Sequence, residues 1–356
     1  MNREEMTNIF KIFMCCTGAI IGAGFASGQE IMSFFVNYGK SGIAGVIISG
    51  VLFFAYVYVV LKKIRLRNIT TFSGYFADVS GKKTAAFIQA VSYGFMFASF
   101  CVMVSGSGAV AEQLFGMNTV GIVFMAVLCF VVFLKGVDGM VAVNAVMTPV
   151  IIIGILAVGV YALIFKDAAV FADFGVERIT DNFFVSAVVY VSYNTVTLIG
   201  ILLPLKKQMT SGKVAFFSAL LSGGMLCSMG LILWSLLWIF KNELVNIGVP
   251  MLFIADKGGV IMKGVYAAVL YMAMITTAVS SGFALLDFLN RRLCLNATVL
   301  PAIMCAVSVP LAYVGFAELV DKLYRFFGFL GVFVLVLVLL DGIKLKIWKK
   351  HLTNKK

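Results

Sequence analysis

The ionisable side chains inside apolar segments are the first candidates for chemistry. Glu30 and Asp287 lie deepest in such segments, and an ionisable group in hydrocarbon is costly enough to suggest a function. Glu30 can bind the ammonium group of a substrate or carry a proton. Alternatively, Ser27 and Glu30 have the spacing of a capping box and serve only to start a helix. Asp287 is close in sequence to Arg291 and Arg292 and is predicted to pair with them.

The sequence offers few of the residue types and motifs that catalyse reactions in enzymes. The only histidine, His351, lies in the basic tail, so histidines cannot form a catalytic dyad or a metal cluster within the membrane. The 7 cysteines fall in apolar segments without a CxxC pair, which is typical of small core residues. There is no G-x-x-x-x-G-K-S/T motif for ATP. We therefore predict that the protein is not an enzyme and has no cofactor, and that any pumping draws on an ion gradient or a separate partner.

The composition is too apolar for a soluble domain. Of the 356 residues, 62% are hydrophobic and 12% are charged, which indicates an integral membrane protein. A membrane-spanning helix needs about 20 mostly apolar residues, and polar interruptions separate about ten such segments. They cover approximately residues 9–38, 42–61, 84–112, 119–134, 140–165, 182–205, 213–240, 262–290, 295–315 and 318–341. Glu112, Lys135 and Asp341 are predicted to mark the ends of spans.

The basic residues predict the orientation in the membrane. If both termini are cytoplasmic, most of the 28 Lys and Arg lie in inner segments, as the positive-inside rule requires. The net charge of +12 then reflects topology and contact with anionic lipid, and not nucleic-acid binding. We expect a multi-pass protein of the bacterial plasma membrane, with a single transporter domain over residues 1–356 and a basic cytoplasmic tail at 344–356.

The first apolar segment has a glycine-rich interruption. The run Gly18-Ala-Ile-Ile-Gly22-Ala-Gly24-Phe25-Ala-Ser27-Gly28-Gln-Glu30 interrupts a segment otherwise long enough to cross a bilayer. Gly22, Gly24 and Gly28 lack the side chain that penalises non-helical backbone. Unwound backbone is tolerated at this depth only beside protein or a watery cavity. The run therefore predicts a broken helix at a substrate site; the alternative is that the glycines only permit close helix packing.

A second interruption is predicted in the sixth span. Ten spans divide into two sets of five in opposite orientation, approximately residues 9–165 and 182–341, which is the geometry of an inverted repeat. The sixth span matches the first and contains Tyr190-Val-Ser192-Tyr193-Asn194-Thr195-Val-Thr197. Ser192 and Asn194 are able to cap a restarting half-helix. The alternative is a continuous helix whose hydroxyl groups bond to its own carbonyls.

One shorter segment lies between the seventh and eighth spans. Residues 242–259 include Val249-Pro250-Met251-Leu252-Phe253-Ile254, which is apolar enough for the interface but too short to cross it. We predict an outer re-entrant lid or an interfacial helix here.

Ten spans, breaks in the first and sixth, and the motif Gly18-x-x-Ile21-Gly22-x-Gly24 together resemble the LeuT-like amino acid-polyamine-cation (APC) superfamily. Within it, the chain is similar to the YkvI-like group of predicted bacterial transporters. The resemblance covers essentially the whole chain, and its sharpest motif is residues 18–30. It implies an all-α protein with a five-plus-five inverted repeat. It also implies a substrate site that includes Gly22, Gly24, Phe25, Ser27, Gly28, Glu30, Ser192, Tyr193, Asn194, Thr195 and, in the third span, Tyr93.

The resemblance further implies a sodium site, because LeuT-like sodium symporters hold the ion between the first break and the eighth span. By motif position, the carbonyls are those of Gly18 and Ile21. The family pattern A-x-x-T/S-T/S is met by Ala273, Thr276 and Thr277, and Ser280 and Ser281 offer a second register. Neutral oxygens suit Na⁺, which is a hard cation; the alternative is a Ser/Thr face that only bonds its neighbours.

Two departures bear on the coupling ion. The fifth span lacks the lysine that some proton-coupled relatives place at the sodium position, which favours sodium. Phe25 follows Gly24 where a second family sodium site has an asparagine. We expect that second site to be absent, which puts in doubt the family's usual way of binding an amino acid carboxylate.

The sequence thus predicts a sodium-coupled symporter that imports a small organic solute, an amino acid or a related amine, by alternating access. Its expected partners are the solute, the sodium ion and the lipid bilayer. The alternatives are proton coupling with Glu30 as the carrier, or a non-transporting nutrient receptor similar to the spore-germination receptor subunits of this superfamily. A channel is disfavoured, since channels usually need repeated pore-lining subunits or rings of charge.

Overall fold

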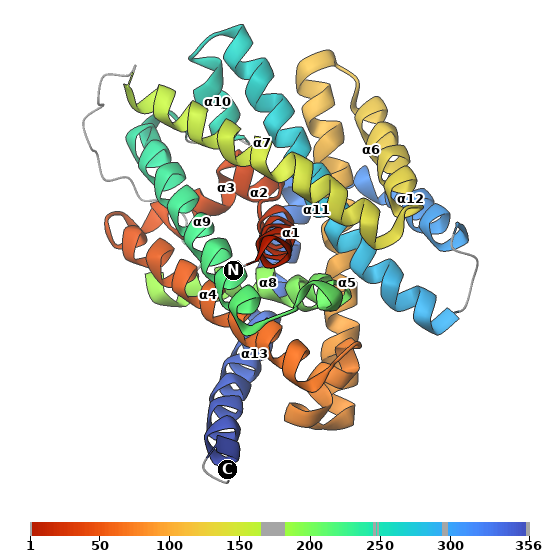
Figure 1. Cartoon of the computed structure of the whole chain (residues 1–356). Helices are drawn as coiled ribbons and strands as arrows, with labels where there is room; N and C mark the ends of the chain where they lie inside the picture. The colour runs from red at the N-terminus through yellow and green to blue at the C-terminus, as the bar shows by residue number, and fades with distance from the viewer. Residues whose placement is uncertain (1, 165–181, 245–246, 248, 294–297, 354–356) are drawn as a thin grey trace.

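The computed structural model describes residues 2–164, 182–244, 247, 249–293 and 298–353 (Figure 1). These residues form helices and connecting turns without any strand, which confirms the expected all-α class. The α-helices are α1 (Arg3–Ile20), α2 (Ala23–Ser27), α3 (Gln29–Phe34), α4 (Ser41–Arg67), α5 (Phe72–Phe115), α6 (Asn118–Phe133), α7 (Gly136–Ile164), α8 (Phe183–Leu202), α9 (Gly212–Ile239), α10 (Pro250–Asp256), α11 (Val260–Leu293), α12 (Val299–Ala312) and α13 (Phe316–Thr353). Short 3₁₀ turns are η1 (Val36–Tyr38), η2 (Pro204–Gln208) and η3 (Lys241–Glu243).

The first apolar segment is broken, as predicted. Helix α1 ends at Ile20, five residues form α2, and α3 starts after Gly28. Gly28 has φ 83°, a left-handed conformation that glycine adopts without strain. The chain therefore changes direction twice within a segment that would otherwise form one helix.

The sixth span is not broken, and the prediction of a second break is wrong. Helix α8 runs without interruption from Phe183 to Leu202. The Ser192 hydroxyl donates to the Val188 carbonyl at 2.6 Å, and the Asn194 amide donates to the Tyr190 carbonyl at 3.0 Å. With no glycine in the polar stretch, these side chains bond to the turn before them and do not cap a new helix.

Helices α1, α8 and α11 form the centre of the bundle, with other helices packed around them (Figure 1). Every residue of α1 from Ile12 to Ile20 is buried. In α8 and α11, 89% of the most apolar 18-residue window is buried, against 39 to 44% in α4, α7, α9 and the described part of α13. The central helices therefore carry the protein-lined positions where a site can form, while the outer helices present apolar side chains to lipid.

Seven described helices or helix parts are long and apolar enough to cross a membrane. They lie in α4, α5, α7, α8, α9, α11 and α13. Helices α6 and α12 are apolar but have 16 and 14 residues, fewer than the roughly 20 of a straight span. The protein is thus a multi-span membrane protein, whereas the count of ten and the inverted repeat stay predictions.

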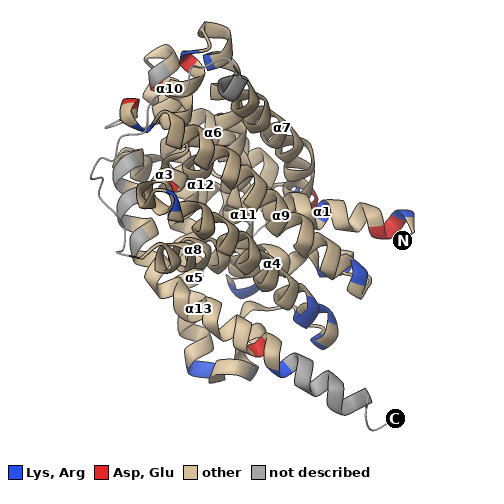
Figure 2. Cartoon of the chain, turned by 90° about the vertical axis from the view of Figure 1, so that its left-hand side faces the viewer, with Lys and Arg blue, Asp and Glu red and all other residues tan. Residues whose placement is uncertain are grey.

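The two ends of the chain lie toward the same side of the molecule, together with many of the Lys and Arg residues (Figure 2). This arrangement is what two cytoplasmic termini require. The orientation in the membrane stays a prediction.

The predicted outer lid contains one short helix. Helix α10 has seven residues, and five of them, Met251 and Leu252 included, are buried. A Cβ atom on Gly28 would lie 3.0 Å from the Met251 side chain, so α10 packs directly on the second bend of the broken helix. Residues 245, 246 and 248 of this segment lie outside the described residues.

Candidate functional site

The three glycines of the broken helix meet three different requirements. A Cβ atom on Gly22 would lie 3.0 Å from Thr277 Oγ1, and one on Gly24 would lie 2.1 Å from Glu30 Oε1. Gly24 lies inside the α2 helix, so it admits the Glu30 carboxylate and does not unwind the backbone. Only Gly28 has the left-handed φ. Two of the three positions are therefore glycine because another side chain occupies the space.

The predicted capping box at Ser27 and Glu30 does not form, and that interpretation is wrong. The N-cap of α3 is Gly28, without a side-chain cap. The Ser27 hydroxyl donates to the Gly24 carbonyl at 3.0 Å and accepts from the Gln29 amide at 3.3 Å. Because Glu30 folds back against Gly24, its carboxylate is not used to start the helix.

Glu30 is buried beside aromatic rings from two other helices. Its side chain is only 5% exposed, and Oε2 has no hydrogen-bond partner. The Tyr193 hydroxyl of α8 lies close to the carboxylate without an aligned hydrogen bond to it, and the Tyr190 hydroxyl of α8 has no partner. Tyr190 and Tyr324 of α13 also lie near the carboxylate. Among the described residues, no Lys or Arg forms an ion pair with Glu30.

The predicted sodium residues of α11 meet the end of α1 in one register. The Thr277 hydroxyl donates to the carbonyls of Gly18 and Ala19 at 3.2 and 3.3 Å. The Thr276 hydroxyl donates to the Ala273 carbonyl at 3.0 Å. Ile21, whose carbonyl was also predicted as a ligand, is the C-cap of α1. A hydroxyl that now donates to a carbonyl can rotate and present a lone pair to a cation, so this oxygen set suits Na⁺.

Ser280 and Ser281, the second register, make different contacts from Thr277. The Ser281 hydroxyl donates to the Thr277 carbonyl at 2.7 Å, within its own helix. The Ser280 hydroxyl accepts from the Asn144 amide of α7 at 3.0 Å. The second register is therefore used within α11 and at the contact between α11 and α7.

Two polar residues of α7, which the sequence analysis did not select, lie next to this oxygen set. A Cβ atom on Gly18 would lie 2.2 Å from Asn144 Oδ1 and 2.4 Å from Thr148 Oγ1. Both side chains are completely buried, and Asn144 Oδ1 has no hydrogen-bond partner. The i, i+4 spacing of two polar residues in an apolar helix was the available signal, since such a pair shares one helix face.

Solved structures share this architecture. A Na⁺-coupled sialic acid symporter in a substrate-bound outward-open state matches with a TM-score of 0.67 at 13% identity, over 91% of this chain and 76% of that one. The chain has the LeuT-like transporter fold. MhsT in complex with L-phenylalanine matches at 0.61 and 14% identity, over 92% and 88%. The nucleobase-cation-symport-1 family transporter Mhp1, in a closed conformation, matches at 0.54 and 14% identity, over 88% and 74%.

Two Bacillus subtilis (strain 168) proteins are homologous to this LeuT-like chain over most of its length. The uncharacterized protein YyaD is 25% identical over 346 residues, which are 95% of this chain and 98% of YyaD. The uncharacterized membrane protein YkvI is 25% identical over 323 residues, 88% and 90% of the two chains. No family model matches the chain. The resemblance to the YkvI-like group is confirmed, and the transport named for the solved structures agrees with the prediction of a protein that is not an enzyme.

The remaining substrate candidates fall into three surroundings of the LeuT-like bundle. Ser192, Asn194 and Thr195 bond back to carbonyls of α8. Tyr193 stacks on Tyr324, with ring centroids 4.9 Å apart, beside Glu30. Phe25 is 1% exposed and packs with Tyr190 around a small cavity.

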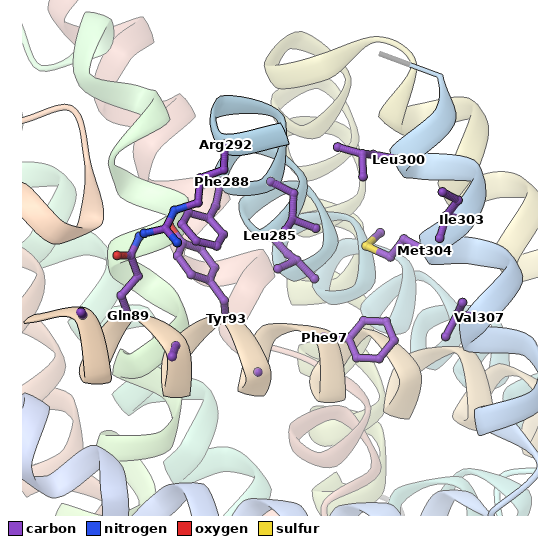
Figure 3. Close-up of a pocket in the computed structure, with 14 residues that line it drawn as sticks. Gln89, Tyr93, Phe97, Leu285, Phe288, Arg292, Leu300, Ile303, Met304 and Val307 are labelled. Carbon is purple, nitrogen blue, oxygen red and sulfur yellow. The ribbon is translucent and has the colours of Figure 1, made fainter. Parts of the chain in front are cut away.

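Tyr93 lines a groove that none of the other substrate candidates lines. It stacks on Phe288 of α11, with centroids 3.9 Å apart, and lines an apolar groove of about 610 Å³ between α5, α11 and α12. Figure 3 shows Tyr93, Phe288 and Arg292 together at one end of this groove. A tyrosine on a membrane helix packs against neighbours more readily than it binds a ligand, and the structure gives Tyr93 such a neighbour.

Asp287 has the partner that the sequence predicted. Its carboxylate pairs with the Arg291 guanidinium at 3.1 Å, one helical turn later. This half-buried pair belongs to the end of α11.

Proposed function

We propose that the protein is a sodium-coupled secondary active transporter of a small organic solute, an amino acid or a related amine. The observation that carries the proposal is the contact of Thr277 Oγ1 with the carbonyls of Gly18 and Ala19 at the broken end of α1. A hydroxyl beside carbonyls that have lost their helical partners offers Na⁺ several neutral oxygens without a buried charge.

The same contact can couple ion binding to the movement of the broken helix α1 against α11 during alternating access. Thr277 belongs to α11 and the carbonyls belong to α1, so an ion bound between them favours the arrangement in which the two helices touch. Asn144 Oδ1 has no partner and lies beside Gly18, which adds a further oxygen at the same place. Binding energy from the ion can then stabilise one orientation of the broken helix over the other.

The test is thermal unfolding of the purified protein in NaCl and in KCl at equal ionic strength. A ligand that binds only the folded protein raises its stability, so we expect a higher midpoint in NaCl. Thr277→Val keeps the shape of the side chain and removes its oxygen. The affinity for sodium, obtained from the midpoint at increasing NaCl concentration, should fall about tenfold or more. Thr197→Val is the matched control, because the Thr197 hydroxyl bonds only to the Asn194 carbonyl of its own helix at 2.9 Å.

Equal midpoints in NaCl and KCl for the unmodified protein would remove the basis for sodium coupling. Uptake into proteoliposomes then separates the other classes: solute accumulation shows a transporter, whereas ligand binding without accumulation shows a receptor.

Proton coupling is the second candidate, and the burial of Glu30 without a basic partner favours it. A carboxylic acid in such surroundings can exchange a proton between the two sides of the membrane. In that case uptake follows a proton gradient in sodium-free buffer, and Glu30→Gln abolishes it.

A further inference from the structure

Glu30 and the three tyrosines beside it form a cluster that the sodium contact does not use. We call Tyr190, Tyr193 and Tyr324 the tyrosine cage. Tyr190 and Tyr193 come from α8, Tyr324 comes from α13, and Glu30 comes from α3. Elements distant in sequence thus converge on one buried carboxylate next to the broken helix.

Among the described residues, no basic side chain balances the negative charge of Glu30. A buried carboxylate is costly unless a cation or several hydrogen bonds compensate it. Glu30 Oε2 and the Tyr190 hydroxyl have no hydrogen-bond partner, and the Tyr193 hydroxyl lies close to the carboxylate without an aligned hydrogen bond to it. A buried carboxylate with so little compensation indicates a ligand that supplies positive charge and hydrogen-bonding groups.

The walls of the cluster distinguish between kinds of cation. The rings of Tyr193 and Tyr324 are stacked with centroids 4.9 Å apart, and Phe34 lies 5.4 Å from Tyr190 and 5.8 Å from Tyr193. An aromatic face attracts an organic ammonium group through its quadrupole. A sodium ion requires a shell of oxygens, which these ring faces do not provide.

We propose that the Glu30 carboxylate and the tyrosine cage bind the ammonium group of a cationic amine, which makes a cationic amine the transported solute. The inference rests on the proposed transport function and narrows its substrate class. A zwitterionic amino acid fits less well, because its carboxylate would lie close to the ammonium group and hence to Glu30, where like charges repel. The rings contact one another, so they must separate to admit the ammonium group.

A pair of ligands that differ only in charge tests the inference on the unmodified protein. Choline and its neutral carbon analogue 3,3-dimethylbutan-1-ol have nearly the same shape. We expect choline, or another member of a panel with n-butylamine, 1,4-diaminobutane and 2-phenylethylamine, to raise the thermal midpoint in KCl or NaCl. The neutral alcohol should leave the midpoint unchanged.

Two variants locate the binding. Glu30→Gln removes the charge and keeps the size, and it should weaken binding of the stabilising amine about tenfold or more, the scale of a charge-assisted contact. Glu112→Gln is the matched control. Glu112 is exposed at the end of α5, where it accepts from the Asn118 amide at 3.0 Å, so this change should leave amine affinity as it is.

Several outcomes overturn the inference. One is a neutral alcohol that stabilises as well as choline, and another is a panel in which no cation stabilises. A third is an amine that binds Glu30→Gln as tightly as the unmodified protein. If only zwitterionic amino acids stabilise the protein, and do so in a sodium-dependent way, the amine site is rejected and the proposed transporter stands. If sodium has no effect on stability, sodium coupling is rejected, and the amine site then stands or falls with the response to choline and the other amines.

Discussion

Two carboxylates are buried to nearly the same degree and have opposite surroundings. Glu30 is 5% exposed and Asp341 is 4% exposed. The Lys63 ammonium of α4 approaches Asp341 Oδ2 of α13 at 2.7 Å, as an ion pair and not an aligned hydrogen bond, and Lys63 is completely buried. Lys63 also donates to the Tyr75 carbonyl of α5 at 2.8 Å. Glu30 has no such basic partner among the described residues.

The difference separates a structural charge from one that is available to a ligand. At Asp341 the protein supplies both charges, so the pair joins α4, α5 and α13 without any other molecule. At Glu30 the protein supplies only the negative charge, together with the Tyr193 hydroxyl close to the carboxylate and a Tyr190 hydroxyl that has no partner. The ligand-free protein should therefore depend on the first carboxylate for stability and on the second for binding.

The largest expected effect comes from breaking the ion pair. Lys63→Met keeps an apolar chain of similar length and leaves Asp341 as an uncompensated buried charge. We expect it to lower the free energy of unfolding by about 3 to 5 kcal/mol. Chemical denaturation of the purified protein in detergent measures the change.

The double variant Lys63→Met/Asp341→Leu distinguishes charge from packing. Replacing both partners by apolar residues is often close to neutral, so most of the lost stability should return. Lys62→Met, at the neighbouring position, should cost less than about 1 kcal/mol, since its ammonium lies over the Tyr58 ring of a half-exposed helix end. A double variant as unstable as Lys63→Met would show that Lys63 acts through its shape.

The sequence identified the region of Glu30 better than that of Asp341. Three glycines within one long apolar segment were enough to predict the first break. The sequence indicates Asp341 only as the end of a span, and Lys63 is there one of the many Lys and Arg residues that predict the orientation, because residues far apart in sequence show no sign of pairing. The buried ion pair depends on how α4 and α13 pack, and packing is a tertiary property.

The details of the site also depended on tertiary contacts. Whether Ser192 and Asn194 cap a new helix or bond back to the old one depends on their neighbours. In the structure the Thr195 carbonyl of the same helix accepts from Tyr56 of α4 at 2.7 Å. Likewise, the motif singled out Gly24, but its space belongs to the Glu30 side chain, and this follows from the orientation of α3.

An intermediate effect is expected where the broken helix holds Glu30. In Gly24→Ala the new methyl group would lie 2.1 Å from Glu30 Oε1, so the carboxylate must move. We expect a loss of about 1 to 3 kcal/mol, the scale of overpacking, and a matching loss of amine binding. In a Glu30→Ala background the same change should cost much less, and that coupling measures the contact.

Gly264→Ala is the control for this change, because Gly264 is exposed in α11 with open space around it. Alanine in a helix is favoured over glycine by about 0.5 to 1 kcal/mol, so this variant should be slightly more stable. An equal cost for Gly24→Ala with and without Glu30 would mean that the methyl group meets the backbone and not the carboxylate.

The smallest expected effect on the ligand-free protein is that of Glu30→Gln, which sharpens the comparison most. The change replaces an uncompensated charge by a neutral amide of the same size, so no ion pair is lost. We expect the free energy of unfolding without ligand to change by less than about 1 kcal/mol, or to rise. Chemical denaturation of Glu30→Gln and of Lys63→Met under the same conditions gives the two free energies of unfolding to compare. A loss as large as that of Lys63→Met would mean that Glu30 has a structural partner, and the two carboxylates would then serve the same purpose.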